Sequence, residues 1–172
     1  MYKNLVARRA CALAVTSFFF SFPFSAQAQT APVAPPVKAA FVYVAPLTDA
    51  GWVRQHDQGR KAVEAALSGK VQTTFVENVA EGPDAERVIR DLAQQGHQII
   101  FTPSFGYMEP TLKVAREFPN VKFESVTGYK TAPNVATSNA RYYEGRYLAG
   151  VAAGRMATQA GYVAGFPIPE VV

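Results

Sequence analysis

Residues 38–57 read KAAFVYVAPLTDAGWVRQHD, and this stretch decides the fold. Ala39 to Val44 is a continuous apolar run with aromatic and β-branched side chains, which is typical of a strand buried on both faces. The loop that follows carries Thr48, Asp49 and Trp52, the only tryptophan of the chain. Ligands of open α/β sheets bind beyond the carboxyl ends of the strands, so this loop is a candidate binding site. Packing of Trp52 against the start of the following helix is the alternative.

Strand and helix patterns alternate through the rest of the chain. Parallel neighbouring strands need crossover connections, and crossover helices bury both faces of the sheet. The alternation therefore predicts an α/β fold with a doubly wound parallel sheet. On the last helix, the four-residue spacing of Gly150 and Gly154 predicts that this helix lies close on the sheet. Strand patterns cover residues 39–44, 71–79, 98–102, 121–127 and 134–140, and helical apolar stripes cover residues 59–67, 85–93, 107–118 and 143–152.

The N-terminus has the pattern of a secretory signal peptide. A basic head with Arg8 and Arg9 precedes an apolar run at residues 10–24, and the small-x-small triplet Ala26-Gln27-Ala28 follows. Residues 1–28 are therefore expected to be removed on export to the periplasm. The paired arginines leave the twin-arginine route open beside ordinary secretion. The apolar run is too short and wrongly flanked for a membrane span, so no direct membrane anchor is expected.

Cysteine usage and charge exclude several classes of function. Cys11 is the only cysteine and lies ahead of the cleavage site, so disulfides, thiol catalysis and thiolate metal sites are excluded from the mature chain. The formal net charge is +4, but three of the basic residues belong to the signal peptide. The mature part is close to neutral, and no nucleic-acid partner is expected.

Catalytic and metal-binding motifs are missing from the sequence. His56 and His97 are the only histidines, and their spacing does not suit a metal site. His97 lies at a helix-strand junction, where a solvated or packing role is expected, whereas His56 is close enough to Trp52 to donate a hydrogen bond to a ligand. The nucleophile-elbow, phosphate-loop, dinucleotide and zinc-protease signatures do not occur. We therefore expect a binding protein with no metal and no cofactor.

The loop after the third strand pattern, residues 102–107 (TPSFGY), falls at the same edge of the sheet. Ser104 offers a hydroxyl, Gly106 permits close backbone approach, and Phe105 and Tyr107 offer two ring faces. Both rings have an alternative role, because Phe105 could cap the core and Tyr107 could begin the apolar stripe of the next helix. Later loops at this edge carry Gly128, Tyr129 and Lys130, and then Asn139 and Arg141.

Five motifs, in order, carry a resemblance to a known family. They resemble the basic membrane protein family of ABC-transporter substrate-binding proteins, and most closely its subgroup that binds adenine or purine nucleosides. The resemblance runs from Lys38 to the last residue. The motifs are DAGWVRQHDQGR (49–60), FVENVAEGPDAERVIRDLA (75–93), FTPSFGY (101–107), FPNVKFESVTGYKT (118–131) and RYYEGRYLAGVAAG (141–154).

The resemblance implies a type I periplasmic binding protein, in which two doubly wound lobes close on a ligand. It implies that residues 38–160 form the flavodoxin-like N-terminal lobe, after a Pro/Ala-rich tether at residues 29–37. Residues 161–172 would begin the crossover to a second lobe that is missing from the chain. Many family members are lipoproteins, and the absence of a lipobox cysteine departs from that pattern.

The resemblance also implies a binding site for a purine. Trp52 would be the stacking platform and Asp49 a polar contact, with the loop from Phe105 through Gly106 to Tyr107 as the neighbouring wall. The resemblance further implies that the transport partner of the protein is an ABC permease in the inner membrane. A small secreted enzyme acting on nucleobases or nucleosides and a ligand-sensing module are the alternatives. The remaining candidate ligand contacts are Thr48, Gln55 and His56.

Overall fold

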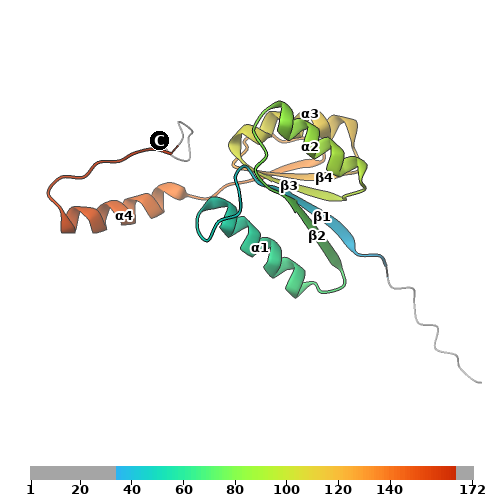
Figure 1. Cartoon of the computed structure of the whole chain (residues 1–172). Coiled ribbons are helices and arrows are strands. Elements are labelled where there is room, and N and C mark those ends of the chain that lie inside the picture. The colour runs from blue at the N-terminus through green and yellow to red at the C-terminus, as the bar shows by residue number, and fades with distance from the viewer. Residues whose placement is uncertain (1–33, 166–172) are drawn as a thin grey trace, which may run out of the picture. The chain divides into compact units, whose positions relative to one another are not determined.

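The computed structural model describes residues 34–165, and its elements follow the predicted alternation (Figure 1). The predicted signal peptide and most of the predicted tether lie outside the described residues, as do residues 166–172. The strands are β1 (Val37–Val42), β2 (Val71–Val76), β3 (Ile99–Pro103), β4 (Lys122–Val126) and β5 (Val135–Ser138). The helices are α1 (Trp52–Ala66), α2 (Pro83–Gln94), the short 3-10 helix η1 (Phe105–Tyr107), α3 (Met108–Glu117) and α4 (Tyr142–Met156).

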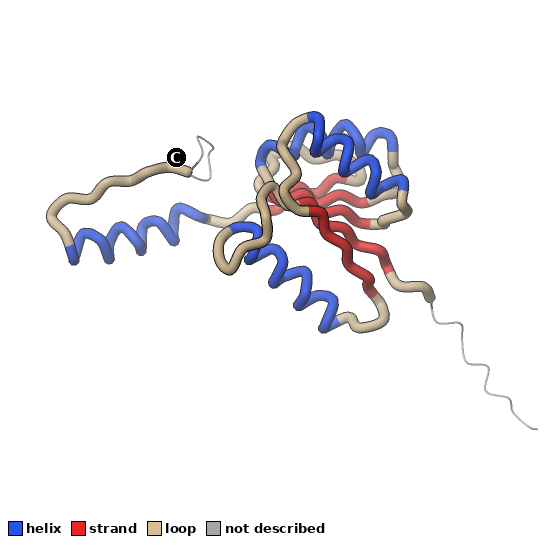
Figure 2. The backbone as a smooth tube through the Cα atoms, in the orientation of Figure 1, coloured by secondary structure: helices blue, strands red, loops and turns tan. Residues whose placement is uncertain are grey.

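The five strands form one parallel sheet in the order β2-β1-β3-β4-β5 (Figure 2). The predicted α/β fold with a parallel sheet is therefore confirmed. Three strands are shorter than predicted, and β4 (Lys122–Val126) lacks one residue at each end of its predicted range. β2 ends at Val76 because the chain turns at Asn78, whose φ of 56° is incompatible with an extended strand. β5 ends at Ser138, although its pattern extends to Ala140.

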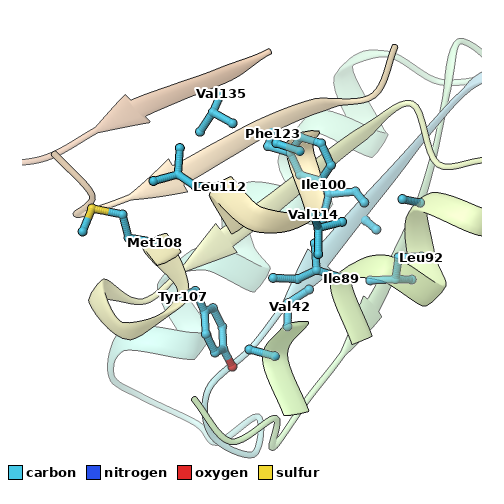
Figure 3. Packing of buried hydrophobic residues seen from close by; sticks show 14 of the residues in the cluster. Val42, Ile89, Leu92, Ile100, Tyr107, Met108, Leu112, Val114, Phe123 and Val135 are labelled. Atoms are coloured by element: carbon cyan, nitrogen blue, oxygen red, sulfur yellow. The ribbon is translucent and has the colours of Figure 1, made fainter. Parts of the chain in front are cut away.

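The helices α2 and α3 cover one face of the sheet, and α1 covers part of the other (Figure 1). Under α2 and α3 lies the larger apolar core, which Figure 3 shows from close by. The buried His97 packs at its margin, with Nδ1 at 2.8 Å from Leu92 O, so the expected packing role of this histidine is confirmed. Core residues include Val42, Ile89, Leu92, Ile100, Tyr107, Met108, Leu112, Val114, Phe123 and Val135.

The loop from β4 to β5 contains no helix, although the two strands pair in parallel. Asn134 fixes the return of the chain at the end of this loop. Its Nδ2 lies within 3.0 Å of three main-chain oxygens, those of Ala115, Phe118 and Val121. These oxygens lie at the C-terminal end of α3 and just beyond it, where helical carbonyls lack intrahelical donors. One side-chain amide therefore joins α3 to the last two strands.

The prediction that the last helix, α4, lies close on the sheet is wrong. Apart from the half-buried Tyr142, the residues of α4 are exposed. A Cβ atom added at Gly150 or Gly154 would meet nothing within 4 Å, so the helix does not lie close on the sheet there. Small residues permit close packing, but only apposed apolar area drives it. Within the described residues, no helix is long and apolar enough to span a membrane.

The smaller core, beneath α1, contains a buried ion pair. Asp57 is fully buried, and its Oδ1 accepts from Arg60 Nε at 2.9 Å while its Oδ2 lies 2.8 Å from Lys61 Nζ. The Arg60 guanidinium also donates to Thr73 Oγ1 at 2.7 Å and lies over the ring of Phe75. Burial alone raises the pKa of Asp57, but the hydrogen bonds and charges of Lys61 and Arg60 outweigh it and hold the pKa below its ordinary value. The pair thus fixes α1 on the edge strand β2.

We predict that Asp57→Asn lowers the free energy of unfolding by about 3 kcal/mol at pH 7, because the buried Arg60 then keeps only the longer 3.4 Å contact to the half-exposed Glu64 carboxylate. The pKa of Asp57 is depressed in the fold, so its contribution is complete above about pH 4 and is lost as the pH falls through the folded-state pKa. The difference between wild type and variant should therefore shrink in acid.

Urea denaturation at pH 7 and at pH 3 measures this difference. The exposed Asp84 provides the matched control, and Asp84→Asn should change stability by less than about 1 kcal/mol. Equal losses for the two variants at pH 7 would contradict the structural role of Asp57.

Candidate ligand-binding site

Three loops meet at the carboxyl edge of the sheet, because β2, β1 and β3 are parallel neighbours. The first-strand loop, residues 43–51, connects β1 to α1. The third-strand loop, residues 104–107, follows β3, and residues 77–82 connect β2 to α2. The two loops that the sequence pointed to therefore lie at one edge.

Trp52, the first residue of α1, is hydrogen-bonded to the last residue of β3. Its indole Nε1 donates a hydrogen bond of 2.7 Å to Pro103 O, which lies 51 residues away in sequence. The residue is nevertheless 36% exposed. Trp52 is therefore anchored through its indole N–H and keeps part of its side chain open to solvent.

Two aromatic side chains flank the indole. The His56 ring meets it edge-on, with centroids 4.6 Å apart, and the Tyr142 ring lies at 5.8 Å in a tilted arrangement. Burial lowers the pKa of His56, so its imidazole is neutral at pH 7. A neutral imidazole has one donor and one acceptor nitrogen, and either can serve a polar ligand.

The polar candidates of the first-strand side are open to solvent. Asp49 and Gln55 are exposed, and the Thr48 hydroxyl donates a hydrogen bond of 2.8 Å to Ala50 O within the same loop. Gly51 precedes the helix with a φ of 93°, a conformation that side chains other than glycine's rarely allow. This turn sets the direction in which α1 and Trp52 leave the loop.

The three candidate residues of the third-strand loop differ in how far they are buried. Phe105 is half-buried, with its ring 6.2 Å from that of Tyr129, and Gly106 is partly exposed. Tyr107 is fully buried, and its hydroxyl donates to Val79 O at 2.6 Å. Burial raises the pKa of Tyr107. Tyr107 therefore belongs to the core, as its position in the helical stripe also suggested, and its ring does not line the edge.

Two glutamates of the β2–α2 connection contact these loops, and the sequence analysis did not single them out. The Glu81 carboxylate accepts from Ser104 Oγ at 2.5 Å and from Gly106 N at 3.2 Å. The Glu77 carboxylate accepts from Leu47 N at 2.6 Å. Both glutamates follow the second strand pattern in the sequence. That position was the sequence signal that could have placed them at the carboxyl edge of the sheet.

The described residues contain no group of His, Cys, Asp and Glu side chains that could hold a metal ion. A hollow elsewhere on the surface, between α2 and α3, is lined by residues that include Glu86, Glu109 and Lys113. The acids there are already paired: Glu86 lies 2.8 Å from Lys113 Nζ, and Glu109 bonds Lys130. The edge around Trp52 is therefore the better candidate for a ligand.

A family model matches the chain over most of its length. Residues 36–172 match the Bmp family, described as ABC transporter substrate-binding protein PnrA-like. The chain belongs to this family. The resemblance drawn from the five sequence motifs is thereby confirmed.

Two curated relatives are similar in sequence to this chain, each over 138 residues. A purine-binding protein of Brucella abortus is 57% identical over 138 residues, which are 79% of this chain and 39% of that protein. A protein of Haloferax volcanii, named provisionally as an ABC transporter glucose-binding protein, is 44% identical over 138 residues and is covered to 35%. The chain thus spans well under half the length of these curated relatives.

Among solved structures, an ABC transporter solute-binding protein from Conexibacter woesei superposes with a TM-score of 0.65 at 26% identity. The superposition covers 78% of this chain and 46% of that one. The parallel sheet described above is therefore the fold of one part of an ABC solute-binding protein.

We predict that Trp52→Phe lowers the free energy of unfolding by about 1 kcal/mol, because the buried Pro103 carbonyl loses its donor while most of the ring packing is kept. Urea denaturation followed by circular dichroism measures the change. Tyr129→Phe is the matched control, since Tyr129 is 68% exposed and should tolerate loss of its hydroxyl. Equal stability of both variants would show that the Trp52 hydrogen bond contributes nothing.

Proposed function

We propose that the chain forms the N-terminal lobe of the periplasmic substrate-binding component of an ABC importer, and that it binds a purine base or nucleoside. The observation that carries the proposal is the indole of Trp52, which is anchored at its edge to Pro103 and is exposed at the carboxyl edge of the sheet. A flat heteroaromatic ligand can stack on such a ring. The 57% identity to a purine-binding protein supports the same ligand class.

The polar contacts follow from the chemistry of a purine edge. Exocyclic amines and ring N–H groups are donors, and the exposed Asp49 carboxylate is an acceptor within the first-strand loop. Neutral His56 can supply either a donor or an acceptor. Phe105 gives a second aromatic surface on the third-strand side, and Thr48, Gln55 and the Gly106 backbone complete the proposed site.

The partner and the compartment follow from family membership and from the predicted signal peptide. An extracytoplasmic substrate-binding protein delivers its ligand to a permease in the inner membrane, so the proposed partner is an ABC permease. Delivery requires release of an unchanged ligand. We therefore propose a binding protein that performs no catalysis and uses no cofactor.

We predict weak binding by the chain of residues 29–172, with a dissociation constant for adenine or adenosine of about 1 mM or weaker. Tight sites bury most of a ligand's surface, whereas an open edge leaves one side of the ligand in water. Titration followed by NMR measures the affinity, and glucose in the same series tests the ligand class suggested by the Haloferax relative's name. A tight one-to-one complex with adenine would contradict the prediction that a single lobe binds weakly. Binding of glucose alone would contradict the proposal that the ligand is a purine.

We predict that Trp52→Ala weakens adenine binding by about 1–3 kcal/mol, the contribution of one stacked base. Trp52→Phe keeps a ring face and should retain most of the affinity. Comparison of the two variants in the same titration separates stacking from loop anchoring, because both variants lack the bond to Pro103. If both variants lose the same affinity for adenine, the loss comes from the missing hydrogen bond to Pro103 and not from the missing stacking.

A further inference from the structure

Residues 77–81, which we call the clamp segment, lie between the two candidate ligand loops and bond to both. Toward the first-strand loop, Val79 N donates to Tyr43 O at 3.0 Å and Asn78 N donates to Ala45 O at 3.3 Å. Toward the third-strand side, Val79 O accepts from the Tyr107 hydroxyl at 2.6 Å. The clamp segment therefore connects two loops that are about sixty residues apart in sequence.

The side chains at the two ends of the clamp segment, Glu77 and Glu81, also bond to the two loops. Glu77 accepts from Leu47 N, in the first-strand loop, at 2.6 Å. Glu81 accepts from Ser104 Oγ and from Gly106 N, in the third-strand loop, and both bonds end on the same oxygen, Oε1. Each carboxylate thus takes a backbone N–H that has no strand or helix partner, and charge-assisted bonds of this kind are stronger than neutral ones.

Two local features agree with a segment held in one conformation. Asn78 has a φ of 56°, a left-handed conformation that costs energy in most residues and persists where its surroundings hold it. A larger residue at position 106 would require the Glu81 side chain to move, because a Cβ atom there would overlap the carboxyl group of Glu81. Backbone and side-chain contacts therefore favour the same arrangement.

We propose that Glu77 and Glu81 are positioning residues that hold the first-strand and third-strand loops in their ligand-binding arrangement. This inference rests on the proposed function, because the arrangement matters for a ligand only if the ligand binds at this edge. Glu81 acts through Ser104 and Gly106 and so fixes the direction of Phe105. Glu77 acts through Leu47 on the loop that carries Thr48 and Asp49.

The first test needs no ligand. In the chain of residues 29–172, Glu81→Ala should speed solvent exchange of the Gly106 amide about two- to tenfold, the effect of losing one hydrogen bond, and leave the Leu47 amide unchanged. Glu77→Ala should do the reverse, so each variant is the control for the other. Glu81→Gln keeps a carbonyl oxygen at Oε1 but loses the charge, so it should speed exchange of the Gly106 amide less than Glu81→Ala does and leave the Leu47 amide unchanged. Unchanged exchange in both alanine variants would overturn the proposal.

Gly106→Ala gives an independent test of the same contact. The added methyl group should displace the Glu81 carboxylate and shift the Phe105 amide resonance, as Glu81→Ala does. In the double variant the overlap is absent, so the two effects should not add. Additive effects would show that Gly106 and Glu81 act separately and would contradict the proposed contact.

The last test measures adenine affinity by NMR titration. Glu81→Ala should weaken binding about two- to tenfold, the effect of ordering the Phe105 side chain only on binding. Glu81→Gln should lose less affinity than Glu81→Ala, and the charge control Asp84→Asn should bind as wild type. If glutamine preserves the Gly106 amide but loses affinity, Glu81 contacts the ligand directly and the positioning role is wrong. If wild type binds glucose and not adenine, the proposed function fails, while the ligand-free exchange still decides whether the glutamates hold the loops.

Discussion

The position of β1 between β2 and β3 is the constraint on which the rest of the structure depends. β1 pairs in parallel with β2 on one side and with β3 on the other, so Ala39 is in register with both Thr73 and Ile99. All three strands therefore end at the same edge, and the segments after them must share that edge. The bond from Trp52 to Pro103 and the bonds of residues 77–81 are consequences of this pairing, because they join segments that only the sheet brings together.

The two faces of the sheet are stabilised by different physical means. The face under α2 and α3 is closed by an apolar core whose members, such as Ile100 and Phe123, are almost fully buried. The other face combines a small apolar cluster with the buried pair of Asp57 and Arg60. On that face Phe101 stacks on Phe41 with ring centroids 4.5 Å apart, yet Phe101 keeps partial exposure. Burial is therefore less complete on the side covered by α1.

Most of the fold could be predicted from the sequence, whereas much of the site could not. Runs such as Ala39 to Val44 are continuously apolar, so a buried strand follows from periodicity, and the alternation of strand and helix patterns predicts parallel pairing. The packing of α4 could not be predicted, because the spacing of Gly150 and Gly154 says nothing about which surface faces it. The depth of Tyr107 depended on whether its hydroxyl would find a buried acceptor, which Val79 supplies. The acceptor roles of Glu77 and Glu81 required knowledge of which backbone N–H groups the neighbouring loops leave unpaired.

The choice of tryptophan at position 52 follows from the demands of this edge. Phenylalanine has no donor for the Pro103 carbonyl, and the donor of tyrosine lies at the far end of its ring. The indole N–H lies on the ring edge, so the bond to Pro103 fixes the plane of the ring without covering its faces. His56 meets the indole edge-on and restricts its rotation further. Under the proposed function, a ring fixed in this way would lose little conformational entropy when a flat ligand stacked on it, because the bond that anchors the ring in the fold also orients it.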